Sequence, residues 1–172
     1  VNRLEDLPRI MRRAAKIALS PPTGPVFISL PGDILNKEAK IDLGKSTRVI
    51  DTYRPSHNSI ELIAKKISKY KKPVIIAGHE VATSGAFKEI TMFAEYTGSA
   101  VYQQTVPHGS HYPSEHMAFM GTLPRLQKPT KNILENYDLL ICVGCDGLRM
   151  SVWSDTEPLP SKMPIIHIGI NE

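Results

Sequence analysis

The fold class rests on the stretch Lys72-Pro73-Val74-Ile75-Ile76-Ala77-Gly78, in which five apolar residues lie between a lysine and a glycine. A run of this length, rich in β-branched residues, is typical of a strand that is buried on both faces of a sheet. Further strands are predicted at 100–104, 138–143 and 164–168, and helical patterns lie at 59–69, 84–96 and 129–136. Strands that alternate with helices predict an α/β fold: an open, parallel, Rossmann-like (doubly wound) sheet with helices on both faces. Because only four strands are predicted, we expect an exposed sheet edge and self-association.

The first 55 residues follow a different pattern. Apolar and basic residues recur at helical spacing over 6–19, which predicts an amphipathic helix that ends at the prolines following Ser20. Residues 25–30 are predicted to form a short buried strand. From 31 to 55 the periodicity disappears, which is typical of a chain that crosses between two domains.

The composition indicates a globular protein and excludes two classes of partner. The 172 residues are 41% hydrophobic, which is enough for a substantial core. No stretch approaches the roughly 18 to 20 apolar residues of a membrane span, and the first residues lack the features of a signal peptide. The net charge of +4 includes a lysine cluster at 65–72, which fits a solvated helix face. We therefore predict a cytoplasmic protein with no nucleic-acid and no membrane partner.

Four segments of the chain share one resemblance. They are Gly24-Pro25-Val26 with Leu30-Pro31-Gly32-Asp33; Lys72 to Gly78 with Ser84-Gly85-Ala86; Gly109, Pro113, His116 and Gly121; and Tyr137 to Gly144. In this order the sequence resembles the thiamine-diphosphate-dependent enzyme family that includes benzoylformate decarboxylase, acetolactate synthase and pyruvate decarboxylase. The resemblance implies that residues 1–33 are the C-terminal end of a pyrimidine-binding domain, 34–56 an interdomain linker, and 57–172 a central domain truncated at its C-terminal end.

The same resemblance implies a scaffold role. In this family the activating glutamate would lie upstream of Val1, and the diphosphate and magnesium would be held by a third domain downstream of Glu172. The fragment is therefore expected to contain no catalytic residue, to bind no cofactor and to be inactive alone. Its parent would bind thiamine diphosphate and Mg²⁺, with a 2-oxo-acid decarboxylase or a related carbon-carbon lyase favoured. Its partners would be the remaining domains of the parent, within a homo-oligomer.

Two alternatives stay open. One is an acetolactate-synthase-like parent with a flavin or adenine-nucleotide site in this domain. The other is a freestanding nucleotide-binding or assembly module that performs no carbon-carbon chemistry. Residues 6–30 distinguish a fragment of a longer enzyme from a freestanding module. A freestanding module would use that segment as an integral part of its sheet.

A nucleotide in this fold would bind where the first strand of the sheet ends. The candidate cofactor-binding residues are Gly78, His79 and Glu80 after that strand, together with Gly144 and Arg149 at the end of a later one. The turn has no second glycine, and the carboxylate of Glu80 would repel phosphate. The arginine-rich pattern of flavin-binding relatives is reduced to Arg149. FAD or ADP is therefore disfavoured, and we expect a nucleotide-type fold without a nucleotide.

No metal site is predicted. The cluster of His108, His111, Glu115 and His116 offers zinc-type ligands, but prolines and a glycine between them break any helix that would converge them, so a structural loop is favoured. Asp146-Gly147 followed by Asn171 approximates the magnesium-binding spacing of the family's third domain. However, Cys145 replaces the first glycine of that motif, and prolines interrupt the stretch where the motif has a helix.

The two cysteines are Cys142 and Cys145, with the spacing of a redox pair. Such a pair belongs at a helix N-terminus, whereas Cys142 lies inside an apolar strand pattern. We predict buried structural thiols.

Overall fold

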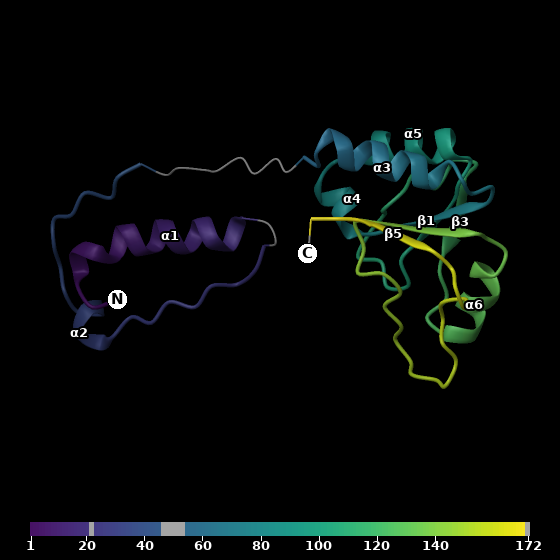
Figure 1. Cartoon of the computed structure of the whole chain (residues 1–172). Helices are drawn as coiled ribbons and strands as arrows, with labels where there is room; N and C mark the ends of the chain where they lie inside the picture. The colour runs from purple at the N-terminus through teal and green to yellow at the C-terminus, as the bar shows by residue number, and fades with distance from the viewer. Residues whose placement is uncertain (21–22, 46–53, 171–172) are drawn as a thin grey trace. The chain divides into compact units, whose positions relative to one another are not determined.

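A computed structural model describes residues 1–20, 23–45 and 54–170. The chain forms two compact units, Val1–Arg54 and Pro55–Ile170, which are treated separately below (Figure 1). Within the described ranges, no helix is long and apolar enough to cross a membrane.

The second unit contains every strand of the sheet. Its elements are α3 (His57–Ile67), β1 (Pro73–Ala77), α4 (His79–Thr83), α5 (Phe87–Thr97), β2 (Ala100–Gln103), β3 (Phe119–Thr122), α6 (Gln127–Leu134), β4 (Leu139–Val143) and β5 (Ile165–Ile168). The strand order is β3-β2-β1-β4-β5, and each neighbouring pair is parallel. This confirms the predicted open α/β sheet.

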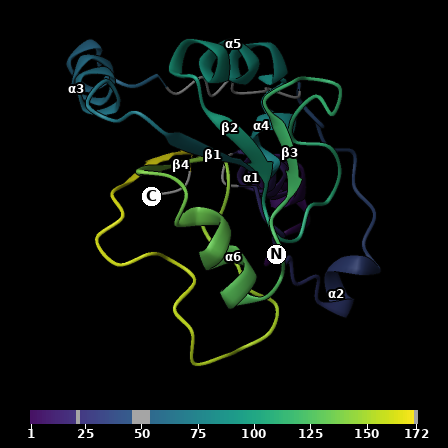
Figure 2. The ribbon, with the colours of Figure 1, turned by 90° about the vertical axis from the view of Figure 1, so that its right-hand side faces the viewer.

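The central strands are buried on both faces, which explains their unbroken apolar sequence. Side chains of Ile75 and Ile141 face α3 and α5, whereas those of Ile76 and Leu140 face α6. Figure 2 shows α3 and α5 on one side of the sheet, and α6 with the long connection between β4 and β5 on the other. The sheet therefore divides the core into two apolar layers.

Two short elements were missed by the sequence prediction. β3 lies inside the stretch 105–129 that we predicted to be irregular, so the sheet has five strands rather than four. Its four residues include Gly121 at φ +102° and are partly exposed, so they form no apolar run. Helix α4 occupies the predicted turn after β1. At five residues it is too short to show helical periodicity, and contacts with the loop after β4 hold it.

The first unit contains the 3₁₀ turn Leu4–Asp6, α1 (Leu7–Leu19) and α2 (Gly32–Leu35). The prediction of a buried strand at 25–30 is wrong, because the segment is extended but pairs with no strand in the described residues, and Phe27 is 90% exposed. Instead, the N-terminal amine donates to the carbonyl oxygen of Ser29 at 2.9 Å. Helix α2 lies at the start of the stretch we predicted to be a linker, and it buries Ile34. Residues 46–53 of that stretch are outside the described ranges.

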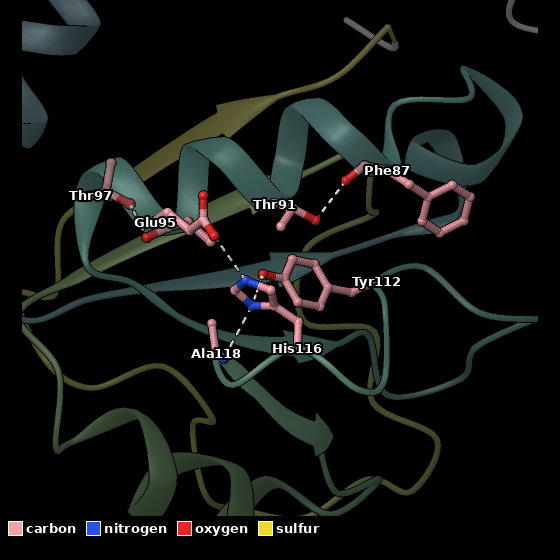
Figure 3. Close-up of polar contacts among 8 residues, drawn as sticks. Phe87, Thr91, Glu95, Thr97, Tyr112, His116 and Ala118 are labelled. Carbon is pink, nitrogen blue, oxygen red and sulfur yellow. Dashed lines mark hydrogen bonds and ion pairs between the residues drawn. The ribbon is translucent and has the colours of Figure 1, made fainter.

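A histidine fixes the loop before β3 to helix α5 (Figure 3). Nδ1 of His116 lies 2.9 Å from the Tyr112 hydroxyl and accepts the N–H of Ala118 at 3.2 Å. Its Nε2 lies 3.2 Å from Oε1 of Glu95 on α5. Because Nδ1 already accepts the Ala118 N–H, the neutral ring carries its proton on Nε2 and donates it to the carboxylate. Burial raises the pKa of Tyr112, so its hydroxyl stays protonated and donates to Nδ1.

We predict that Tyr112→Phe lowers the free energy of unfolding by about 1 kcal/mol, because it deletes the hydroxyl donor of a part-buried hydrogen bond. Urea denaturation measures the change. Tyr96→Phe is the matched control, since Tyr96 is 84% exposed and its variant should stay within about 0.5 kcal/mol of the parent chain. Equal effects of the two substitutions would contradict the role of the Tyr112–His116 hydrogen bond.

Candidate site at the carboxyl ends of the central strands

The strand order reverses between β1 and β4, and open α/β sheets bind ligands beside such a reversal, at the carboxyl ends of the strands. Gly78 follows β1 there, and Gly144 follows β4. The N–H of Gly78 donates to the Val143 carbonyl oxygen at 2.9 Å, and the N–H of Glu80 donates to the Gly144 carbonyl oxygen at 3.0 Å. The structure thus brings three of the sequence-predicted residues together.

The contact at Gly78 leaves no space between the two strand ends. A Cβ atom built on Gly78 would overlap the carbonyl oxygen of Gly144 and the Cβ of Cys145. Gly144 has φ +59°, and a Cβ there would lie 2.7 Å from the Cβ of Glu80. Two of the first N–H groups of α4, which would receive a phosphate in a nucleotide-binding fold, already bond to backbone carbonyl oxygens. The N–H of Glu80 bonds to Gly144, and that of Val81 bonds to Gly78 at 3.2 Å.

Glu80 has a structural partner at this edge. Its Oε2 accepts the N–H of Ile170 at 2.9 Å, so the carboxylate fixes the chain that leaves β5. A phosphate at the same place would meet a negative charge. The geometry therefore does not fit a diphosphate at the end of β1.

Arg149 stands apart from the other candidate residues. Its side chain is exposed and lies 3.5 Å from Asp146, another exposed group on the same loop. Its carbonyl oxygen accepts the hydroxyl of the buried Thr105, which ties the loop after β4 to the loop after β2. Cofactor binding by these five residues stays a prediction.

A cavity of about 400 Å³ opens beside the same strand ends, on the α6 face of β4 and β5. Its lining includes Cys142, Asp146, Leu148, Glu157, Leu159 and His167. Nε2 of His167 donates to the Cys145 carbonyl oxygen at 2.9 Å. With two carboxylates in an otherwise mainly apolar lining, the cavity favours an uncharged or cationic group over a phosphate. Sequence reasoning missed it because Glu157 and Leu159 come from a connection without periodicity.

The histidines separate into two groups. The ring of His79 lies 5.9 Å from that of His111 and 6.3 Å from that of His108, whereas His116 pairs with Glu95. Sequence analysis did not connect His79 with the other two, because 28 residues lie between it and His108. Among the residues that the structure describes, no group of three or more His, Cys, Asp or Glu side chains is placed to hold a metal ion.

His111 is fully buried, and both of its ring nitrogens lack a side-chain or backbone hydrogen-bond partner. Burial, then the charge of His79, lowers the pKa of His111; His108 acts in the same direction, and the backbone of Ala77 acts against them. The imidazole is therefore held neutral.

Comparison with known proteins gives the family. Residues 60–172 match the thiamine pyrophosphate enzyme central domain. The chain belongs to this family. It is 31% identical, over 99% of its length, to the acetolactate synthase large subunit of Corynebacterium glutamicum.

Two solved structures are similar over almost the whole chain. The 4-hydroxybenzoylformate decarboxylase of Rhodococcus jostii RHA1 has a TM-score of 0.88 and 25% identity over 99% of this chain. The benzoylformate decarboxylase of Polynucleobacter necessarius has a TM-score of 0.86 and 26% identity over 98%. The chain spans 28% of the Corynebacterium protein and 33% and 32% of the two solved chains, so it corresponds to about a third of each relative.

We predict that Gly78→Ala destabilises the second unit by more than about 3 kcal/mol, because the new methyl group must displace backbone atoms. Gly85→Ala is the control. Gly85 ends α4 with φ +64° and open space around it, so this variant should cost only the left-handed strain of about 1 to 2 kcal/mol. Thermal unfolding followed by circular dichroism compares them, and equal losses would contradict the close contact.

Because His111 is buried and neutral, we predict that the folded protein loses stability in acid. Above its ordinary pKa of 6.5 the imidazole is neutral in both the folded and unfolded states. Below that pH the unfolded chain takes up a proton that the folded chain resists, so the free energy of unfolding falls by up to about 1.4 kcal/mol per pH unit. Urea denaturation from about pH 7.5 to about pH 5 should show a shallower fall for His111→Leu. Asn58→Gln, at an exposed and non-titrating position on α3, should keep the parent slope, and a parent slope in His111→Leu would count against the assignment.

Proposed function

We propose that this chain is the scaffold portion of a longer thiamine-diphosphate-dependent enzyme, with residues 1–33 ending a pyrimidine-binding domain, 34–56 linking the domains and 57–172 belonging to the central domain. The observation that carries the scaffold role is the direct packing of Gly78 against Gly144 and Cys145. A Rossmann-type sheet would hold a diphosphate at this place, whereas here contacts within the protein occupy it. In this proposal, thiamine diphosphate and Mg²⁺ would be held by other parts of the longer protein.

The activity we propose for the longer protein is decarboxylation of a 2-oxo acid. It is supported by the two solved structures named as benzoylformate-type decarboxylases, which share the fold of this chain over at least 98% of its length. Thiamine diphosphate supplies the electron sink for such chemistry when it is bound. This chain would contribute shape and stability rather than a reacting group, and its partners would be the remaining domains of a cytoplasmic homo-oligomer.

An acetolactate-synthase-like parent is the second candidate. It is favoured by the 31% identity to the Corynebacterium relative, the higher identity among these comparisons. In that case a flavin or adenine nucleotide would bind to this domain. The cavity beside β4 and β5 could take only the uncharged ring portion of such a ligand, because its two carboxylates disfavour a phosphate.

A freestanding module has less support. Of the first 54 residues, those that the structure describes (1–20, 23–45 and 54) contribute no strand to the sheet, whereas an independent module would be expected to use its first helix and strand there. Similarity to longer enzymes also extends over 99% of the chain, so it includes the first unit.

Calorimetric titration tests the scaffold proposal. We expect no heat of binding when the purified chain is titrated with thiamine diphosphate plus Mg²⁺, with FAD or with ADP, because the amides of Glu80 and Val81 already bond to carbonyl oxygens and the Glu80 carboxylate lies at the same edge. Binding of FAD or ADP would overturn it in favour of the second candidate. An Arg149→Ala variant, altered at an exposed side chain, would then lose affinity if the nucleotide uses the predicted residues.

A further inference from the structure

The scaffold role uses the packing of Cys145 against Gly78 but not the thiols of the two cysteines, which are arranged as a pair. Cys142 is 3% exposed and Cys145 is 6% exposed, and both are free thiols. A thiol buried among apolar groups is ordinarily inert. Any reactivity must therefore come from the position of one thiol relative to the other and from a route that leads to them.

The register of β1 and β4 and the bend after Cys142 place the side chains of the two cysteines close together. Cys142 is the register partner of Ile76 on β1, and adjacent strands lie about 4.8 Å apart. After Cys142 the chain bends at Gly144, and Sγ of Cys145 returns to within 3.6 Å of the Ile76 carbonyl oxygen. Both side chains pack in the apolar layer on the α6 face. The thiols are thus neighbours on one side of one strand end.

The surroundings make the two thiols chemically different. Hydrogen bonding with Cys145, and then burial, raises the pKa of Cys142. Hydrogen bonding with Cys142 lowers the pKa of Cys145, and the backbone at Gly147 and Val143 acts in the same direction, against burial and the charge of Asp146. Cys145 is therefore the more readily ionised sulfur, with a protonated thiol beside it.

A route to the pair exists through the cavity beside β4 and β5. Cys142 lines this space of about 400 Å³, which is far larger than a hydroperoxide group needs. Asp146 and His167 lie on the same lining, and both are solvent-exposed residues. Cys145 is not part of the lining, so a small polar oxidant reaches the pair from the Cys142 side, without unfolding of the sheet.

We propose that Cys142 and Cys145 form a redox-modification site, a dithiol that a hydroperoxide converts reversibly into an intramolecular disulfide. The Cys145 thiolate attacks one peroxide oxygen, the O–O bond breaks, and the leaving hydroxide takes the proton released by Cys145, which gives water and a sulfenic acid. The Cys142 sulfur then attacks the Cys145 sulfur, the S–O bond breaks, and hydroxide leaves with the Cys142 proton as a second water. The dithiol loses two electrons and the peroxide gains them.

The disulfide would act on the contact that closes the strand ends. Cys145 packs against Gly78, and its thiol donates to the Ile76 carbonyl oxygen. Bonding to Cys142 removes that donor and redirects the Cys145 side chain. Oxidation would therefore change the contacts at the junction of β1, β4 and α4.

Peptide mapping of the full chain tests this. The folded protein is treated with a small excess of hydrogen peroxide, then denatured with N-ethylmaleimide and digested with trypsin, which leaves both cysteines in the peptide 132–149. We expect this peptide to carry no N-ethylmaleimide and to be lighter than the reduced peptide by the mass of two hydrogen atoms. When dithiothreitol is added before the blocking step, the peptide should carry two N-ethylmaleimide groups. Two labels without dithiothreitol, or a peptide cross-linked to a second copy, would overturn the proposal.

Single variants test the division of roles. Cys142→Ala removes the resolving thiol, so Cys145 should accumulate as a sulfenic acid that dimedone traps, whereas Cys142 in Cys145→Ala should stay unmodified. Equal trapping in both variants would contradict the assigned roles. If a variant does not fold, the mass of the parent peptide still decides whether the disulfide forms.

Discussion

The second unit depends on the backbone contact between the ends of β1 and β4. Gly78 lies directly against Gly144 and Cys145, and two N–H groups on the β1 side, those of Gly78 and Glu80, donate to carbonyl oxygens on the β4 side. This contact extends the parallel register of the two central strands past their ends and positions α4. It also uses the space that a nucleotide-binding relative of this fold would keep open.

Because the strand ends pack against each other, the remaining polar side chains lie beside them rather than between them. Glu80 turns outward and holds the chain after β5, while His79 lies beside His108 and the buried His111. The loop after β4 crosses to Thr105 and leaves a cavity on the α6 face. A scaffold domain can carry such groups without a reacting substrate, because their contacts are with the protein itself.

The sequence prediction was correct for the strands that are buried on both faces. It was wrong where strand formation depends on whether a partner strand is present. β1 and β4 are apolar along their whole length, and any parallel sheet would bury them. β3 has only four partly exposed residues and exists because β2 pairs with it. Residues 25–30 have the composition of a strand but find no partner strand among the described residues, so apolar side chains such as Phe27 remain exposed. Strand formation needs a neighbour to satisfy backbone hydrogen bonds, and composition cannot report whether one is present.

The sequence by itself determined the fold class and the parallel sheet, because these follow from the order of apolar runs and helical patterns along the chain. Membership of the thiamine-diphosphate family came from the resemblance of its motifs, and the family match over residues 60–172 confirms it. It also named Gly78, Glu80 and Gly144 as residues of one strand edge. Only the tertiary structure decided that this edge is closed, that His79 joins His111, and that Cys145 returns to the β1 carbonyl beside Cys142. Those outcomes depend on distances of a few ångströms between segments far apart in the chain, and register and loop packing set them rather than local sequence.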